Sequence, residues 1–383
     1  MTSEGPAGKR LIAPLSSEIS TIAAAVIGNI LIWFDIALFG FLALPISKSF
    51  FPSGEGDLAL LLTLGTFAAS FVVRPIGSII LGAYADRHGR KASLLLSIRL
   101  IACGTALIAF MPSYDHAGML APLGVLVARC IQGFAAGGEY GSSTAYLAEI
   151  SPGQRGWLAS LQTASQAVSG MMAAAFGAAL SNWLDPASLV QWGWRLPFVF
   201  GLLVVPIGYY LRVNMRELSA PEPQNNPAAQ LIRTRLPALM AGIGLLAVAT
   251  SSAYLLSYLP AYAGRNMNVS QVFVYCIIMV AFFVQIITAP LAGLLSDRIG
   301  RPTLMMTSCI IIGATAYPAF SLMSARKGEV ALAIFVVSLA LIRSLYTGPL
   351  PAFLADLFHR ETRATGVALS YTCFSAFISA TST

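Results

Sequence analysis

Long apolar stretches follow one another along almost the whole chain, and short polar connections separate them. A helix needs about 20 mostly apolar residues to cross a hydrocarbon core about 30 Å thick. The pattern therefore predicts an all-α integral membrane protein with eleven spans. These cover residues 19–45, 58–84, 92–112, 119–147, 157–182, 196–212, 237–263, 270–295, 303–324, 329–355 and 364–383.

The eleventh stretch runs to the last residue, with no charge or turn signal after it. We therefore expect this sequence to end within its eleventh helix, as a truncated form of a longer protein. The first stretch carries Asn29 and Asp35 and is too long for a cleaved signal peptide, so it is expected to remain in the protein.

Composition supports a membrane protein. The 383 residues are 57% hydrophobic and 10% charged, whereas a soluble domain has about 25% charged residues. The net charge of +7 does not indicate nucleic-acid binding, because the basic residues are spread over short connections. Fourteen Lys and Arg lie in the connections on the side of the amino terminus and four on the other side. By the positive-inside rule, the amino terminus is cytoplasmic.

A division into two halves is indicated by a polar connection and by a repeat. The longest connection is rich in Pro and Asn and reads as a linker over residues 217–236, between halves 1–216 and 237–383. A motif after the second span recurs 211 residues later, after the eighth span. Its positions are Gly82, Asp86, Arg87, Gly89 and Arg90, which recur as Gly293, Asp297, Arg298, Gly300 and Arg301.

This duplicated GxxxDRxGR loop resembles the signature of the major facilitator superfamily. The resemblance implies two six-helix halves, with the second half incomplete here, and a gating role for the ten motif residues. Physically, the glycines allow helices to approach closely, and Asp86 and Asp297 can accept bonds at the amino terminus of a neighbouring helix. The arginines are expected to face the cytoplasmic surface.

Three further strings resemble the metabolite:proton symporter branch of that superfamily. They are GNILIWFD at 28–35, RPIG at 74–77 and RCIQGFAAGGEYG at 129–141. Between Pro112 and Phe198 the chain is similar to citrate and tricarballylate carriers. One departure is Ile32, where the branch commonly has a Glu. Any role of that Glu is absent or displaced in this chain.

Several polar side chains lie inside the predicted spans and are candidates for binding a small organic anion. Arg343 is near the middle of the tenth span, and Arg129 lies on one face of the fourth span together with Gln132. An arginine at membrane depth turns toward the protein interior, and its planar fork matches a carboxylate. The other candidates are Asn29, Tyr254, Tyr258, Tyr346, Gln162, Gln166 and Arg74, each of which can instead act only as a tie between helices or in packing.

Asp35 and Glu139 are the two acids well inside the predicted spans, and all three histidines lie in connections. Proton coupling is therefore expected to use Asp35, Glu139 or an arginine–carboxylate pair. For Glu139 the alternative is a structural carboxylate held by an arginine of another helix. For Arg343 the available protein partner is Asp35, which would make the pair structural, and the competing partner is a substrate carboxylate, which is the interpretation we favour.

These features favour a secondary transporter over other classes. The chain has no GxxxxGK[ST] loop for an ATP-driven pump, no catalytic triad and no cysteine–histidine spacing for a metal, so no enzyme, cofactor or metal is expected. The leading hypothesis is proton-coupled uptake of a di- or tricarboxylate such as citrate or tricarballylate, by a monomer in a bacterial inner membrane. The alternatives are a uniporter or exchanger of shikimate, oxoglutarate, proline or betaine, and a channel.

Overall fold

A computed structural model describes residues 16–51, 56–215, 227–267, 269–326 and 328–381. Within these ranges, the regular structure is entirely helical, and eleven helices have 18 residues or more. The long helices are α1 (Ser16–Phe41), α3 (Gly56–His88), α4 (Arg90–Phe110), α6 (Leu120–Ile150), α7 (Arg155–Trp183), α9 (Leu196–Val213), α10 (Pro227–Asn266), α11 (Gln271–Ile299), α12 (Arg301–Arg326), α13 (Glu329–Thr347) and α15 (Arg363–Thr381). Four short helices join them: α2 (Ala43–Phe50), α5 (Tyr114–Ala117), α8 (Pro186–Gln191) and α14 (Leu350–Asp356).

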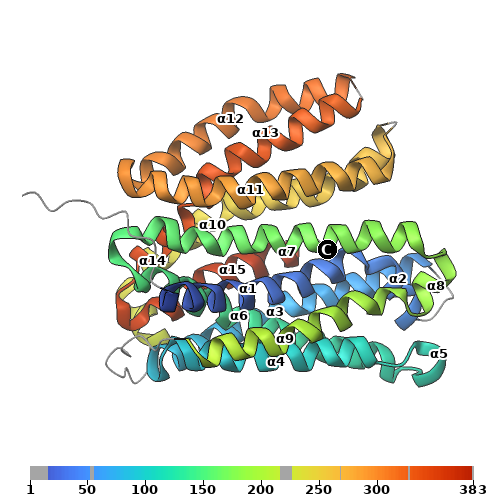
Figure 1. Cartoon of the computed structure of the whole chain (residues 1–383), viewed down its shortest axis with the longest axis horizontal. Coiled ribbons are helices and arrows are strands. Elements are labelled where there is room, and N and C mark those ends of the chain that lie inside the picture. The colour runs from blue at the N-terminus through green and yellow to red at the C-terminus, as the bar shows by residue number, and fades with distance from the viewer. Residues whose placement is uncertain (1–15, 52–55, 216–226, 268, 327, 382–383) are drawn as a thin grey trace, which may run out of the picture.

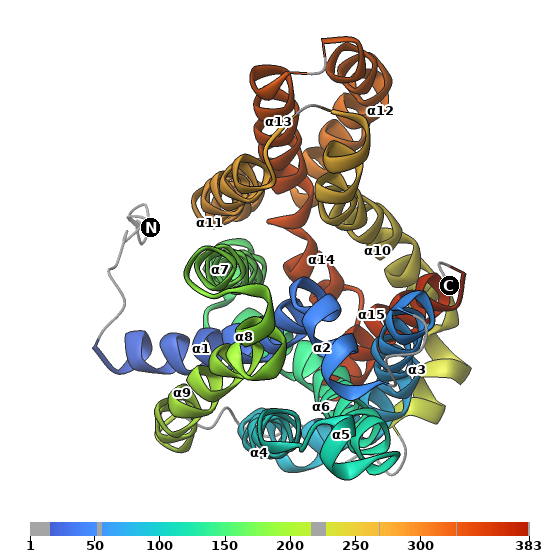
Figure 2. The ribbon, with the colours of Figure 1, turned by 90° about the vertical axis from the view of Figure 1, so that its right-hand side faces the viewer.

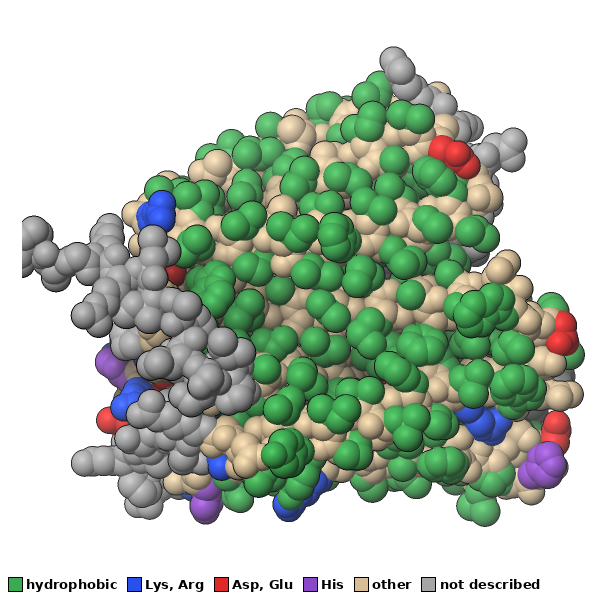
Figure 3. Space-filling model, in the orientation of Figure 1, with side chains coloured by type: hydrophobic (Ala, Val, Ile, Leu, Met, Phe, Trp, Pro, Cys, Tyr) green, Lys and Arg blue, Asp and Glu red, His purple; other side chains and the backbone are tan. Residues whose placement is uncertain are grey.

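The long helices correspond one by one to the eleven predicted spans. In the described part of the chain, nine segments are both long and apolar enough to cross a membrane. α7 and α15 are the two long helices outside that set. Apolar side chains cover the middle of the molecule, and charged side chains gather toward the two ends of its long axis (Figure 3). This distribution matches a bundle whose middle faces lipid.

Two predicted spans are divided in the structure. The first span was expected to reach residue 45, but α1 ends at Phe41 and α2 starts at Ala43. The tenth span was expected to continue to residue 355, but α13 ends at Thr347 and α14 starts at Leu350. Pro349 lies in that break, and proline cannot supply the backbone N–H that a continuous helix needs.

The predicted linker is helical in its second part. Residues 217–226 lie outside the described residues, and residues 227–236 belong to α10. Arg235 interrupts this helix with non-helical angles, φ −134° and ψ 25°. The division of the chain into halves at 216 and 237 stays a prediction.

Helices from the two ends of the sequence lie together in the bundle (Figures 1 and 2). α11, α12 and α13 form a group beside α7, while α15 packs among α3, α6 and α10. A buried apolar cluster joins Tyr140 of α6 to Tyr346, Leu354 and Val367 of the later helices. The core therefore runs across the junction of the early and late helices.

Candidate functional site

Asp35 of α1 lies at the centre of a buried polar cluster formed by three helices. Its Oδ2 atom accepts a hydrogen bond from the Thr105 hydroxyl of α4 and one of 2.5 Å from Gln132 Nε2 of α6. Gln132 Oε1 in turn accepts a bond of 2.7 Å from Arg129 Nη1. All four side chains are at most 3% exposed. The Gln132 amide therefore lies between the Asp35 carboxylate and the Arg129 guanidinium and bonds to both.

Arg129 has donor capacity that the cluster does not use. Its guanidinium carbon lies 4.3 Å from the ring centroid of Phe39 and 5.1 Å from that of Phe67. Among the described residues, its Nε and Nη2 atoms have no hydrogen-bond acceptor. An arginine stacked on aromatic rings in this way keeps its charge without a direct carboxylate partner and can bind an anion through the free edge.

Arg343 of α13 is held by neutral groups. Its Nε atom donates to Ser252 Oγ of α10 over 3.0 Å, and its Nη1 atom donates to Gln285 Oε1 of α11 over 2.5 Å. Its Nη2 atom is 3.5 Å from the Ala249 carbonyl oxygen. The alternative of an Arg343–Asp35 pair is not seen, because Asp35 bonds to Thr105 and Gln132 instead. No carboxylate of the described residues forms an ion pair with Arg343.

Asn29 and Gln162 are mutually bonded and fully buried. Gln162 Nε2 donates to Asn29 Oδ1 over 3.0 Å, and Asn29 Nδ2 donates to Ser165 Oγ over 2.5 Å. Trp33 Nε1 also donates to Asn29 Oδ1, and Ser143 Oγ donates to Gln162 Oε1. These bonds tie α1, α6 and α7 together, which is the arrangement expected for interhelical ties.

Glu139 of α6 forms an ion pair with Arg212 of α9. Both carboxylate oxygens accept bonds from the guanidinium, and Arg212 Nη1 also donates to the Leu94 carbonyl oxygen over 2.5 Å. Neither side chain is more than 1% exposed. Gly28 of α1 leaves room for this pair, because a Cβ there would lie 1.8 Å from Arg212 Nη2. Arg212 ends the predicted sixth span, 196–212, and is one of the basic residues counted there toward a cytoplasmic connection, but its side chain turns inward to Glu139.

The remaining candidates for substrate binding lie apart from these clusters or have local partners. The Tyr346 hydroxyl donates to the Leu245 carbonyl oxygen over 2.6 Å. The Arg74 guanidinium lies over the rings of Phe71 and Trp33, and Gln166 is partly buried. Tyr254 and Tyr258 lie on α10, and their side chains are outside the described part of the structure.

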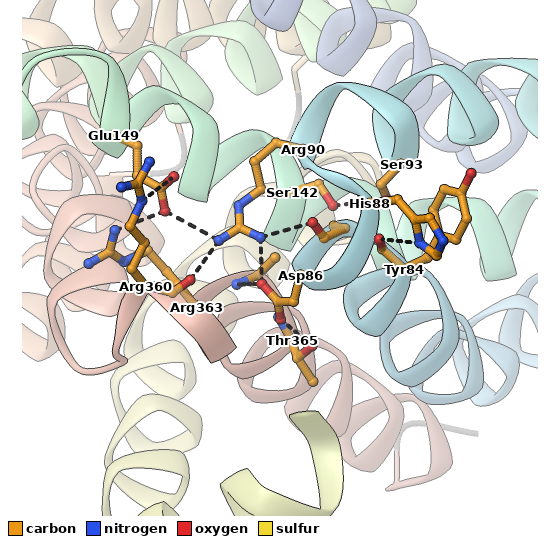
Figure 4. A network of polar contacts seen from close by, with 12 residues as sticks. Tyr84, Asp86, His88, Arg90, Ser93, Ser142, Glu149, Arg360, Arg363 and Thr365 are labelled. Atoms are coloured by element: carbon orange, nitrogen blue, oxygen red, sulfur yellow. Dashed lines mark hydrogen bonds and ion pairs between the residues drawn. The ribbon is translucent and has the colours of Figure 1, made fainter. Parts of the chain in front are cut away.

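The first copy of the repeated motif joins α3 to the amino terminus of α15 (Figure 4). Asp86 accepts bonds from the backbone N–H groups of Ala364 and Thr365 and from the Thr365 hydroxyl. Arg90 donates to Asp86 Oδ1 over 2.5 Å and to the Arg360 carbonyl oxygen over 2.8 Å. The sequence predicted bonding of Asp86 at a helix amino terminus. It placed Arg90 at the surface, but this side chain is 2% exposed because it bonds to these buried acceptors.

Glu149 extends this network at the same end of the bundle (Figure 4). It accepts bonds from Arg90 over 3.3 Å and from Arg363 over 2.9 Å, and it lies 3.6 Å from Arg360. These three arginines surround the Glu149 carboxylate, and their contacts connect the ends of α4, α6 and α15. Arg87 is exposed beside this network.

The second copy makes the equivalent contact between α11 and the amino terminus of α7. Asp297 accepts bonds of 2.9 Å and 3.2 Å from the backbone N–H groups of Gly156 and Trp157. Arg301 bonds to Asp297 and to Asp356. This copy is more open, since the Asp297 and Arg301 side chains are 14% and 19% exposed, and Arg298 is exposed. The two copies together close this end of the bundle, which we call the motif end.

The motif glycines serve two purposes. Gly89 and Gly300 both have φ of 93°, a conformation that favours glycine, and they separate α3 from α4 and α11 from α12. Gly82 and Gly293 lie against a neighbouring helix, where a Cβ would come within 2.9 Å of Thr365 Cα and 2.4 Å of the Gly156 carbonyl oxygen. Close helix approach was predicted from the motif. The gating role itself stays a prediction.

The residues of these clusters that were not predicted as site residues include Thr105, Ser252, Gln285 and Arg212. Thr105 and Ser252 are small hydroxyl residues in apolar helices, where many such residues only bond their own backbone. Gln285 is the one amide inside an otherwise apolar stretch of α11, and this isolated polar residue at membrane depth is the signal that identifies it.

Comparison with known proteins identifies the family. The sequence model of the Major Facilitator Superfamily matches residues 25–381. The chain belongs to the major facilitator superfamily. It is therefore a multi-pass membrane protein, as the apolar spans predicted.

Relatives in the superfamily carry different substrates. A citrate-proton symporter of Klebsiella pneumoniae is 35% identical over 367 residues, which cover 94% of this chain and 83% of the symporter. An alpha-ketoglutarate permease of Escherichia coli K12 is 35% identical over 363 residues, which cover 92% and 83% of the two chains. A proline/betaine transporter of the same organism is 30% identical over 369 residues, with coverage of 91% and 73%. The predicted similarity to citrate-proton symporters is confirmed.

Solved structures of the superfamily share the fold. The proton:xylose symporter XylE of E. coli, bound to 6-bromo-6-deoxy-D-glucose, superimposes on this chain with a TM-score of 0.80 at 16% identity. The superposition covers 96% of this chain and 88% of the XylE chain. The human organic anion transporter MFSD10 gives a TM-score of 0.68 at 16% identity, with coverage of 94% and 92%. These similarities confirm the predicted all-α major facilitator fold.

Proposed function

We propose that this protein is a symporter that takes up a small organic anion together with protons, and that the anion is a di- or tricarboxylate such as citrate. Its relatives named as citrate-proton symporters support both the anion and the proton. The observation that carries the proposal is Arg343, a partly buried cation of α13 whose contacts among the described residues are all neutral.

A cation in this position needs an anion. Arg343 lies fourteen residues after Glu329, the first residue of α13, which places it about 20 Å along the helix at 1.5 Å per residue. An unpaired charge at such a depth costs several kcal/mol by most estimates. A substrate carboxylate removes that cost by binding the planar guanidinium with two parallel hydrogen bonds. Transport of an anion therefore explains why no carboxylate of the described residues pairs with Arg343.

Asp35 is our candidate for the proton-carrying group. It is connected to Arg129 through Gln132, so the carboxylate and the guanidinium influence each other without direct contact. A nearby cation favours the charged form of a carboxylate, and withdrawal of that cation favours the protonated form. An anion that binds the free edge of Arg129 would in this way promote proton uptake by Asp35. Glu139 is less suited to this exchange, because both its oxygens are held by Arg212.

The closed motif end supports alternating access between two halves. We place this end, and the amino terminus, on the cytoplasmic side of a bacterial inner membrane, as the excess of basic residues indicates. The structure then represents a conformation closed toward the cytoplasm. Transport requires the contacts of Asp86 and Asp297 to break, so that the substrate can leave on that side. We infer that the two halves, 1–216 and 237–383, move relative to each other in this step.

The test is uptake by purified protein in liposomes. Radiolabelled citrate, tricarballylate, 2-oxoglutarate, proline and glycine betaine are offered separately, with and without an imposed pH gradient, beside liposomes that lack the protein. We expect a carboxylate to accumulate only with protein and only when the outside is acidic. Accumulation of proline or betaine but of no carboxylate would contradict the proposal that the substrate is an organic anion. Equal carboxylate movement with and without the gradient would indicate a uniporter or exchanger. It would contradict the proposal that transport is coupled to protons.

A further inference from the structure

Gln285 is a buried polar residue in the middle of α11 that faces Arg343 of α13. Its side chain is 1% exposed, and its Oε1 atom accepts the 2.5 Å bond from Arg343 Nη1. α11 carries no other amide side chain between Gln271 at its start and Ile299 at its end. An isolated amide at membrane depth costs free energy unless its polar atoms form hydrogen bonds.

The chemistry of Arg343 fixes the orientation of the Gln285 amide. A guanidinium can only donate hydrogen bonds, so the carbonyl oxygen of the amide must face it. The amide nitrogen then points away with two N–H donors. Among the described residues, this Nε2 atom is buried and has no acceptor. Buried side-chain donors normally have one, so the nitrogen requires an acceptor that the described side chains do not supply.

Arg343 and Gln285 together form a cluster of donors. Arg343 Nη2 lies 3.5 Å from the Ala249 carbonyl oxygen, which is long for a hydrogen bond. This group is therefore weakly bonded. The weakly bonded Nη2 group and the unsatisfied Nε2 group belong to side chains that touch each other through the bond between Nη1 and Oε1. A ligand that fits them must offer two acceptors close together and no donor. A carboxylate has this property, whereas an amide or an ammonium group does not.

The cluster also borders the contact between early and late helices. Thr347, one turn from Arg343 on α13, accepts a bond of 2.7 Å at its carbonyl oxygen from the Thr163 hydroxyl of α7. The Thr347 hydroxyl bonds back to the Arg343 carbonyl oxygen over 3.1 Å. A group bound at Arg343 and Gln285 therefore lies one helical turn from the junction between α7 and α13.

We propose that Gln285 is a substrate-contacting residue that completes the anion site, with its amide nitrogen donating to one oxygen of a substrate carboxylate and Arg343 donating to the other. This proposal rests on the function proposed above. Gln285 keeps Arg343 in place through its oxygen and selects for a carboxylate through its nitrogen. A purely structural partner of Arg343 would perform only the first of these tasks.

Citrate binding to three purified variants separates these roles. Gln285→Leu removes both atoms, and Gln285→Glu keeps an acceptor for Arg343 but replaces the donor with a second carboxylate oxygen. Thr288→Val is the control, because Thr288 lies one turn along α11 and bonds to Ser344 of α13 without reaching Arg343. Isothermal titration gives the dissociation constants, and thermal unfolding in detergent shows whether each variant is folded.

We expect Gln285→Leu to bind citrate about tenfold or more weakly, which corresponds to the loss of one hydrogen bond to a charged group. Gln285→Glu should lose citrate binding almost completely and unfold at a higher temperature, because its carboxylate takes the place of the substrate on Arg343. Thr288→Val should bind within about twofold of the wild type.

Two results would overturn the proposal. One is a folded Gln285→Leu variant with the affinity of the wild type. The other, which decides the question if Gln285→Leu does not fold, is a Gln285→Glu variant that binds citrate as well as the wild type does, because this variant lacks the amide donor that the proposal requires. If the wild type binds neither citrate nor the other carboxylates of the uptake panel, the proposed function itself fails, and the comparison of variants is not reached.

Discussion

Gly156 of α7 and Gly293 of α11 face each other so closely that a Cβ on either would lie 2.4 Å from the carbonyl oxygen of the other. This approach lies beside the bonds from Gly156 and Trp157 to Asp297. The second motif copy therefore needs a glycine on both helices to form. On the first copy only one glycine is involved, since a Cβ on Gly82 would lie 2.9 Å from Thr365 Cα of α15.

A side chain at Gly293 should therefore hold the motif end open. We expect Gly293→Val to shift the population away from the closed conformation, because the two backbones cannot approach. The measurement is the distance between spin labels on the exposed residues His88 and Ile299, in a background in which the five cysteines are replaced. The distribution should move to longer distances than in the unsubstituted protein.

The matched control for this change is Gly313→Val on α12, where a Cβ would meet nothing within 4 Å. It adds the same side chain to a long helix without crowding a neighbour. A distance distribution that is unchanged in Gly293→Val, or equally changed in both variants, would show that the approach of α7 and α11 does not govern closure.

Loss of Asp86 should affect closure more than loss of Asp297. Asp86 is fully buried and accepts three bonds from α15 and one from Arg90, whereas Asp297 lies in the more open copy. We expect Asp86→Asn to lengthen the same spin-label distance more than Asp297→Asn does, since a buried charged acceptor contributes more than an exposed one. An equal or reversed effect would contradict the difference inferred from burial.

The motif contacts show what a sequence can predict in such a protein. Asp86 and Asp297 recur at the same offset from glycine, so their bonding to helix amino termini followed from the repeat. Arg212 shows the limit. Its position at the end of an apolar stretch indicates only a nearby connection, and gives no sign of Glu139 on α6 or of the space left by Gly28 on α1. Those depend on which helices are neighbours.

Separating Glu139 from Arg212 should destabilise the protein. Glu139→Gln leaves a fully buried guanidinium without its carboxylate, and breaking a buried pair costs about 3–5 kcal/mol. We expect a clearly lower unfolding temperature in detergent. The double variant Glu139→Leu with Arg212→Met should recover most of the loss, because no unpaired charge remains. A double variant less stable than either single variant would argue against this pairing.

Asp35→Asn should uncouple transport from protons. Asparagine keeps the shape of the side chain and can still bond to Thr105 and Gln132, but it cannot release or take up a proton. We expect citrate accumulation driven by a pH gradient to be lost while exchange of labelled for unlabelled citrate continues. Asp185→Asn, at the exposed amino terminus of α8, is the control and should accumulate citrate normally. Normal accumulation by Asp35→Asn would place the coupling group elsewhere.

The polar clusters were only partly predictable because apolar helices give little information about their rotation. Arg129 and Gln132 were placed on one face by their spacing, and the structure bonds them to each other. A pair between Asp35 and Arg343 was the alternative to substrate binding, because both are charged at membrane depth. Their actual partners, Gln132 and Gln285, are neutral amides, and a sequence alone does not show that an amide rather than a carboxylate lies opposite a cation.

The most direct test of the central claim is citrate binding to the wild type, Arg343→Lys and Arg343→Ala by isothermal titration, with unfolding profiles to confirm folding. Lysine keeps the charge but not the two-pronged contact. We predict weaker binding in Arg343→Lys, by about tenfold, and no measurable binding in a folded Arg343→Ala variant. A folded Arg343→Ala protein that binds citrate with the affinity of the wild type would contradict the account.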